Sequence, residues 1–150
     1  MSVPKIGQSA IDFEAVDQDG KKIRLGDFEG KVVALYFYPK DNNPGCTAEA
    51  CSFRDDSDEL EAAGIKVLGV SADSVESHKR FEKKHNLNLT LIADKSREII
   101  EAYGVKGQFG TARRVTYLID RDGVIKHVWF KVHASGHSRE VLEKVKELGL

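Results

Sequence analysis

Both cysteines of the chain lie in one short segment. Residues 39–51 have the sequence Pro-Lys-Asp-Asn-Asn-Pro-Gly-Cys-Thr-Ala-Glu-Ala-Cys, and no other cysteine occurs among the 150 residues. A chain of this length can bury its own core without disulfide bonds, so two cysteines favour redox catalysis or metal binding over a structural framework. Cys46 and Cys51 are therefore the first candidates for a chemical role.

The segment should place Cys46 in the first turn of a helix. Asn43 is a favoured N-cap residue, and Pro44 suits the first helical position. The unpaired N–H groups and the positive dipole end of that turn stabilise a thiolate. The helix end contributes about 0.3–2 kcal/mol, whereas lowering a thiol pKa from about 8.5 to about 6 needs roughly 3.4 kcal/mol. A nearby cation is needed as well.

Strands and helices alternate around this segment. Val32–Tyr38 is too continuously apolar for a strand with one wet face, so we expect a central strand buried on both faces. The order predicts an α/β, thioredoxin-like fold with a mixed central sheet, helices on both faces and an N-terminal hairpin. The other strands are expected at Ile11–Val16, Lys22–Leu25, Lys66–Ser71, Leu89–Ala93, Val115–Ile119 and Val124–Phe130, and the helices at about Pro44–Ala62, at about Ser74–His85, around Ile99–Tyr103 and from an N-cap at Ser138 onward.

Composition indicates one globular domain over residues 1–150. Apolar residues make up 41% of the chain and charged residues 31%, and the net charge is −1. This balance gives no electrostatic reason to expect nucleic acid or anionic lipid as a partner. No apolar run approaches the roughly 18 residues of a membrane span, and the start does not resemble a secretory signal. We expect a cytoplasmic protein, monomeric and without a membrane partner.

The segment 39–51 closely resembles the active-site loop of the peroxiredoxin Q family, also called bacterioferritin comigratory proteins. Residues 53–55, 69–71, 102–105 and 116–120 resemble further family segments in the expected order, so the likeness covers nearly the whole chain. The resemblance implies a thiol peroxidase that reduces hydrogen peroxide and organic hydroperoxides. It implies no metal or organic cofactor, and thioredoxin or a similar dithiol protein as the reductant.

The resemblance also implies the roles of five residues. The peroxidatic cysteine of the family falls on Cys46 and its resolving cysteine on Cys51. Its loop proline falls on Pro39, its helix glutamate on Glu49 and its catalytic arginine on Arg114. The arginine supplies the missing cation and a fork of donors that can polarise the O–O bond. Hydrogen-bond donors matter because an ordinary thiol is already a few per cent ionised at neutral pH. Full ionisation would therefore raise the rate of reaction with peroxide only about thirtyfold.

Asn43 departs from the family pattern, which usually has Thr or Ser at this position. That hydroxyl is understood to hydrogen-bond the peroxide, and an amide can also donate while capping the helix equally well. If the Asn43 oxygen instead accepts from the Cys46 N–H, it competes with the substrate. The rate and the peroxide preference depend on which of these holds. The stretch Lys106–Arg113 is also shorter than in many relatives, which would open the site to bulkier hydroperoxides.

The two cysteines also allow a zinc site or a thiol–disulfide exchange or binding protein. A zinc site could join Cys46 and Cys51 to His133 and His137, but more than eighty residues separate the two pairs, whereas such sites usually close over about a dozen. The chain could also be a thiol–disulfide exchange or binding protein on a thioredoxin-like scaffold. Such oxidoreductases use Cys-x-x-Cys, and here four residues separate the cysteines. Cys51 taken alone could equally be a buried core residue.

Other polar residues are expected to lie outside the site. Arg113 and Arg114 are adjacent on an entering strand, so they should point to opposite faces, with only one reaching the site. His78 and His85 lie on a helix rich in Lys and Glu and are expected to be solvated. The acids of 55–61 are interpreted in the same way, as a solvated helix face.

The spacing of the cysteines predicts a conformational change. Residues five apart on an intact helix have their Cα atoms roughly 8.6 Å apart, since they differ by about 140° in rotation and 7.5 Å in height. A disulfide requires no more than about 7 Å. If Cys46 and Cys51 share one helix, that helix must unwind locally before the two sulfurs can bond.

Overall fold

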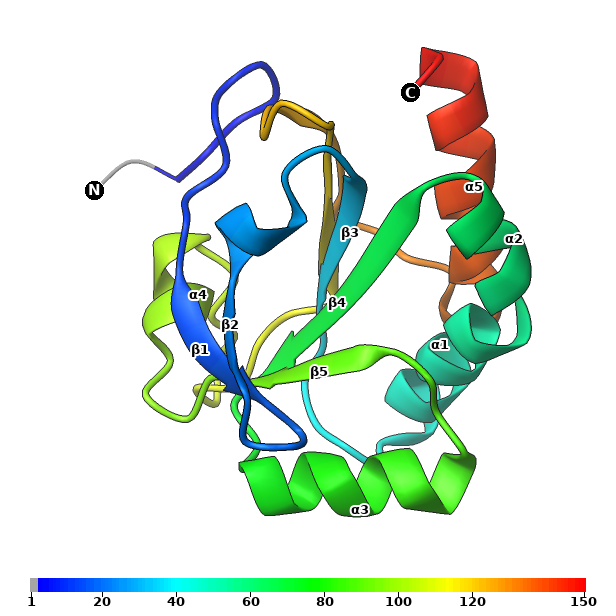
Figure 1. Ribbon diagram of the computed structural model, residues 1–150. Coiled ribbons are helices and arrows are strands. Elements are labelled where there is room, and N and C mark those ends of the chain that lie inside the picture. Colours follow the sequence, from blue (N-terminus) through cyan, green and yellow to red (C-terminus); the bar gives the residue numbers. More distant parts are fainter. Residues whose placement is uncertain (1–2) are drawn as a thin grey trace.

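The computed structural model describes residues 3–150 and contains one seven-stranded mixed sheet (Figure 1). The strand order is β2-β1-β5-β4-β3-β6-β7, in which β3, β4 and β5 run parallel and the remaining neighbours pair antiparallel. The predicted mixed sheet with an N-terminal hairpin is confirmed. Its strands are β1 (Glu14–Asp17), β2 (Lys22–Arg24), β3 (Val32–Phe37), β4 (Ile65–Ser71), β5 (Thr90–Ala93), β6 (Val115–Ile119) and β7 (Ile125–Trp129).

Helices cover both faces of the sheet, as expected from the alternating pattern. In Figure 1, α1, α2 and α5 lie on one side of the sheet and α4 on the other. Among residues 3–150, no helix is long and apolar enough to cross a membrane. The helices are α1 (Pro44–Asp55), α2 (Ser57–Ala62), α3 (Val75–His85), α4 (Glu98–Ala102) and α5 (His137–Leu148), with short 3-10 turns η1 (Leu25–Phe28) and η2 (Ala134–Gly136).

The central strand β3 divides the core into two apolar clusters. All six of its residues are buried, as the sequence predicts. Val32, Ala34 and Tyr36 belong to the cluster that contains residues of α1, α3 and α5. Val33, Leu35 and Phe37 face the opposite way, into the cluster that contains the buried residues of α4. Burial on both faces holds β3 in place, so its carboxyl end is a fixed starting point for the loop that follows.

Two predicted helix boundaries are wrong because tertiary contacts override local sequence. The expected helix over about 44–62 is interrupted at Asp56, which separates α1 from α2. The Asp56 carboxylate accepts a hydrogen bond from the Ser138 hydroxyl at 2.6 Å and forms an ion pair with Arg139 at 3.3 Å. Ser138 is therefore not the cap of the last helix: α5 begins one residue earlier, after Gly136.

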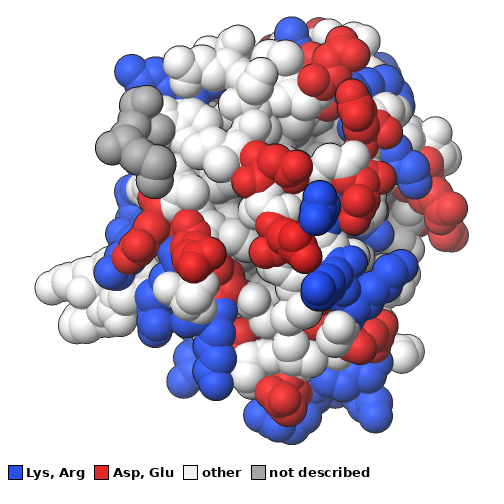
Figure 2. Space-filling view, turned by 60° about the vertical axis from the view of Figure 1, so that its left-hand side comes forward, with Lys and Arg blue, Asp and Glu red and all other residues white. Residues whose placement is uncertain are grey.

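The surface carries both signs of charge. On the face that Figure 2 shows, Lys and Arg side chains are interspersed with Asp and Glu. This distribution matches the net charge of −1. It gives that face no single-sign field of the kind that attracts nucleic acid.

The contact between β3 and β4 yields a stability prediction. Gly69 is paired with Tyr36, and a Cβ at Gly69 would lie 2.8 Å from the Tyr36 ring and hydroxyl. We expect Gly69→Ala to lower the free energy of unfolding by about 1–3 kcal/mol in urea denaturation. Gly26→Ala is the matched control, because its Cβ would meet nothing closer than Asp12 at 3.4 Å. Equal effects of the two substitutions would contradict this packing.

Candidate active site

Local sequence fixes Cys46 in the first turn of α1. Asn43 adopts an extended backbone, and its Oδ1 accepts hydrogen bonds from the N–H groups of Gly45 at 3.0 Å and Cys46 at 3.2 Å. Pro44 occupies the first helical position, where a missing N–H costs nothing. The predicted cap is confirmed, and Cys46 is almost completely buried, at 1% exposure.

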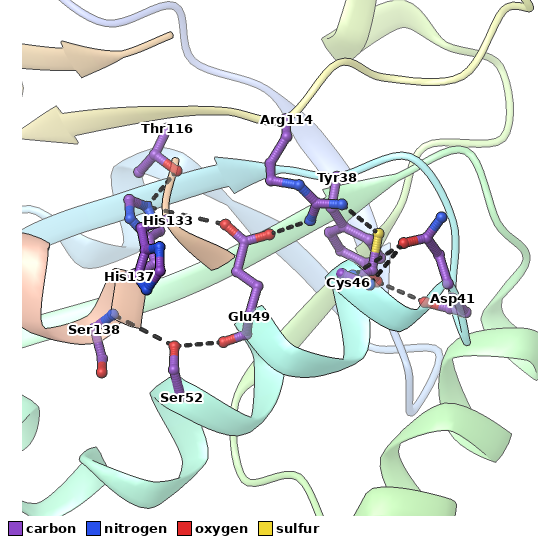
Figure 3. A network of polar contacts seen from close by, with 12 residues as sticks. Tyr38, Asp41, Cys46, Glu49, Ser52, Arg114, Thr116, His133, His137 and Ser138 are labelled. Atoms are coloured by element: carbon purple, nitrogen blue, oxygen red, sulfur yellow. Dashed lines mark hydrogen bonds and ion pairs between the residues drawn. The ribbon is translucent and has the colours of Figure 1, made fainter. Parts of the chain in front are cut away.

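The topology of the sheet brings Arg114 to Cys46. Because β6 runs antiparallel to β3, its first residue Val115 is paired with Phe37, the last residue of β3. The residue before β6 therefore lies beside the loop that leads into α1. Arg114 Nη2 is 3.4 Å from Cys46 Sγ, as Figure 3 shows. A Cβ at Gly45 would lie 2.9 Å from the same nitrogen, so a larger residue there would displace the guanidinium from this position.

Glu49 holds the other arm of the guanidinium. It lies three residues after Cys46, on the same side of α1, and its Oε1 accepts a hydrogen bond from Arg114 Nη1 at 2.9 Å. The Glu49 side chain is fully buried, and burial raises its pKa to about 8 despite the nearby Arg114 charge. Arg114 thus bridges a carboxyl group and a thiol that are both out of contact with solvent.

The resting thiol is not activated by the helix end in the way the sequence suggested. Burial raises the pKa of Cys46, while the backbone N–H of Lys40 and the charge of Arg114 lower it in part. The N–H groups of the first turn are already hydrogen-bonded to Asn43 Oδ1. Stabilisation of the thiolate therefore depends on Arg114 rather than on free helix amides.

His137, which the sequence raised only as a possible zinc ligand, lies beside Glu49 in this site. It is fully buried at the start of α5, and its Nε2 lies 4.0 Å from Glu49 Oε2 and 2.7 Å from Thr116 Oγ1. Its Nδ1 is 2.9 Å from Glu140 Oε1. Burial lowers the pKa of His137. The histidine comes 88 residues after Glu49, so no local motif joins them.

A second polar cluster anchors the loop between β3 and α1. Asp41 Oδ2 accepts from the Ser77 hydroxyl at 2.8 Å and contacts His78 Nδ1 at 2.7 Å, while Tyr38 donates to Asp41 Oδ1 at 2.7 Å. The expectation that His78 is solvated is wrong: it is fully buried, because it faces the sheet and its Nε2 is 3.0 Å from the Ile92 carbonyl. The loop is thereby tied to α3 and β5.

Comparison with known proteins identifies the family. Residues 6–128 match the AhpC/TSA family model. The chain is 42% identical over 154 residues to peroxiredoxin Bcp of Escherichia coli, with 98% of this chain and 99% of that protein covered. The chain belongs to the Bcp/PrxQ peroxiredoxins, within the AhpC/TSA family. It is therefore a thiol peroxidase.

Solved structures agree with this assignment. A Cys-to-Ser variant of PrxQ from Xylella fastidiosa superposes with a TM-score of 0.93 at 30% identity, covering 100% of both chains. The bacterioferritin comigratory protein of Xanthomonas campestris, described for its alkyl peroxide reduction activity, gives a TM-score of 0.86 at 32% identity over 92% of both chains. The thioredoxin-like fold expected from the sequence is thereby confirmed.

The structure also places the remaining candidates of this peroxiredoxin. Pro39 lies half-buried in the loop before α1, and Cys51 is half-buried within α1, with both cysteines present as free thiols. Arg113 points away from the site, as expected, and donates to the Gly104 carbonyl at 2.8 Å.

The residues considered for a zinc site do not lie close enough together to bind one ion. Within residues 3–150, the one group of three or more His, Cys, Asp or Glu side chains close enough to share an ion consists of Asp41, Asp73 and His78. Cys46 and His137 do not belong to it. The cysteines and histidines considered for zinc are thus not assembled into one site.

The position of Asn43 Oδ1 yields a test of competition with substrate. We expect Asn43→Gly to raise the rate constant for peroxide about three- to tenfold, because it frees the Cys46 N–H and costs the cap only a few tenths of a kcal/mol. Asn43→Asp is the control: it keeps the acceptor, adds negative charge beside Cys46 and should lower the rate. Stopped-flow oxidation measures both. A slower Asn43→Gly would instead mean that the Asn43 amide assists the peroxide as a donor.

Proposed function

We propose that this peroxiredoxin reduces hydrogen peroxide and organic hydroperoxides with Cys46 as the nucleophile. The observation that supports this assignment most strongly is the contact of Arg114 Nη2 with Cys46 Sγ at 3.4 Å, from a guanidinium held at its other arm by Glu49. The cation favours the thiolate, and its donors can stabilise the charge that develops on the leaving oxygen. The Xanthomonas relative described for alkyl peroxide reduction supports the inclusion of organic peroxides.

The cycle has three balanced steps. The Cys46 thiolate attacks one peroxide oxygen, the O–O bond breaks, and the products are a Cys46 sulfenic acid and an alkoxide or hydroxide that takes up a proton. The Cys51 thiol then condenses with the sulfenic acid, releasing water and forming the Cys46–Cys51 disulfide. A dithiol protein, for which we propose thioredoxin, exchanges with this disulfide and restores both thiols. No metal or organic cofactor enters any of these steps.

The proposal assigns the other residues to positioning. Glu49 holds the guanidinium of Arg114, and Pro39 shapes the loop that carries Cys46. Asn43 caps the helix beneath the reacting sulfur. In this proposal the 150 residues act as one domain, monomeric and cytoplasmic. A thiol–disulfide exchange protein is the weaker candidate, because its chemistry has no need for the arginine beside Cys46.

Substitution of the two cysteines separates their roles. We expect Cys46→Ser to abolish peroxide turnover, because no other thiol contacts Arg114. Cys51→Ser should still consume one peroxide per chain and then stall with thioredoxin, since the sulfenic acid has no partner in the chain. A coupled thioredoxin assay beside single-turnover oxidation measures both. Full steady-state activity of Cys51→Ser would remove Cys51 from the cycle.

Disulfide formation should require local unwinding of α1. Cys46 and Cys51 both lie within the continuous helix Pro44–Asp55, so their Cα atoms are too far apart for a disulfide by about 1.5 Å. The resolving step therefore needs an open form of residues 46–53, and its rate reflects the cost of opening them.

Amide hydrogen exchange tests this unwinding. We expect the oxidised protein to exchange faster than the reduced protein across residues 46–53 and equally across α5. Cys51→Ser oxidised by one equivalent of peroxide is the matched control, because it carries the oxidised sulfur without the disulfide. Equal protection of residues 46–53 in both states of the unmodified chain, with the disulfide confirmed by mass, would contradict the prediction.

A further inference from the structure

We propose that Glu49 holds Arg114 as a neutral carboxylic acid, so that the guanidinium charge is reserved for Cys46. This inference rests on the proposed role of Cys46 as nucleophile. It makes Glu49 a positioning residue whose protonation state controls the reactivity of the thiol.

One cation faces two acidic groups in this site. Arg114 reaches Cys46 Sγ with Nη2 and Glu49 Oε1 with Nη1, at 3.4 and 2.9 Å. If Glu49 were ionised, two negative charges would share one positive charge in a buried environment, where their repulsion is strong. A neutral carboxyl oxygen still accepts the hydrogen bond from Nη1, so the position of the guanidinium is kept while its charge is not neutralised.

The surroundings of Glu49 favour the neutral form. The side chain is fully buried, and within residues 3–150 its Oε2 has no hydrogen-bond partner. An ionised carboxylate with one unsatisfied oxygen in such a place is costly, because buried charge needs both pairing and hydrogen bonds. The single hydrogen bond from Arg114 satisfies only Oε1.

The hydrogen bonds of His137 leave it without an N–H to donate to Glu49. Its Nδ1 faces the Glu140 carboxylate, an acceptor, so Nδ1 carries the hydrogen of the neutral ring. Its Nε2 then accepts from the Thr116 hydroxyl and carries no hydrogen for Glu49 Oε2, 4.0 Å away. No N–H of His137 therefore stabilises a negative charge on Oε2, which favours the neutral carboxyl group.

Glu49 is a weaker acid than protonated His137 in this site, the reverse of the usual order for a carboxyl group and an imidazole. Burial raises the pKa of Glu49 to about 8, and burial lowers the pKa of His137, so the proton resides on the carboxyl group at neutral pH. The pKa of Glu49 is the net result of burial, which raises it most, and of the charges near the carboxyl group. The titratable or charged groups that face it are Cys46 on α1, Arg114 before β6, His137 and Glu140 on α5, and Tyr36 on β3, whose own pKa burial raises.

The consequence is that the Cys46 thiolate becomes less reactive toward peroxide at alkaline pH. Below about pH 8 Glu49 is neutral, and Arg114 acts on Cys46 alone. As the pH rises through that value Glu49 ionises, and its charge raises the pKa of Cys46 and offsets the guanidinium. The peroxide rate constant per Cys46 thiolate should then fall, while the thiolate fraction itself rises with pH over the same range.

The pH profile of single-turnover oxidation tests this inference. In the Cys51→Ser background, we expect the peroxide rate constant, divided by the thiolate fraction from a separate titration of Cys46, to fall severalfold between about pH 7 and about pH 9.5, a span that brackets the Glu49 titration. Adding Glu49→Gln should abolish that fall, whatever the absolute rate of the variant, because Gln cannot ionise. Glu61→Gln, at an exposed position on α2, is the matched control and should keep the fall. An equal alkaline fall with and without Glu49→Gln overturns the proposal.

Infrared spectroscopy gives a readout that a merely structural role would not move. The protein with Glu49 should show a protonated-carboxyl C=O band at neutral pH that is missing from Glu49→Gln and disappears with a midpoint near pH 8. The absence of that difference at neutral pH also overturns the proposal. If Glu49→Gln does not fold, Glu140→Gln replaces it. The negative charge of Glu140 raises the pKa of Glu49, so its removal should move the midpoint of the band to lower pH.

These outcomes are separable from failure of the proposed function. Peroxide turnover retained by Cys46→Ser would disprove the role of the nucleophile. An active Cys46 enzyme with a Glu49-independent pH profile would disprove only the role of the neutral carboxyl.

Discussion

The guanidinium of Arg114, placed between Cys46 and Glu49, is the interaction on which the active site depends. Both acidic groups are buried, and burial raises the pKa of each. The Lys40 backbone N–H and the Arg114 cation offset part of the loss of solvent around the sulfur. The packing around the site brings that cation to the thiol and keeps the sulfur buried.

The fold meets this requirement with few elements. β3 is buried on both faces and delivers the loop that ends at Asn43, while β6 runs in the opposite direction and delivers Arg114 to the same edge. The hydrogen bonds of Asp41 fix the loop against α3, and Gly45 leaves space for the guanidinium. The Cys46 turn is thus held from both sides, whereas the proposed disulfide with Cys51 requires α1 to open.

Local patterns were sufficient for part of this structure. The apolar run of β3, the cap at Asn43 and the alternation that separates Arg113 from Arg114 follow from rules that act within a few residues. His137, the buried His78 and the break at Asp56 depend on Glu49, Asp41 and Ser138, which are 88, 37 and 82 residues away, respectively. No periodicity or capping rule encodes such contacts, and His78 was wrongly assigned to solvent because its neighbours on α3 are charged.

A double-mutant cycle tests most directly whether Arg114 acts on Cys46 in the position that Glu49 sets. Peroxide rate constants and Cys46 pKa values would be measured for Arg114→Lys, Glu49→Gln and the double variant, all in the Cys51→Ser background. We predict that Arg114→Lys slows the reaction by well over the roughly thirtyfold available from ionisation, and that the two substitutions are coupled by about 0.5–3 kcal/mol. Additive effects, or a loss that follows the thiolate fraction alone, would contradict this account.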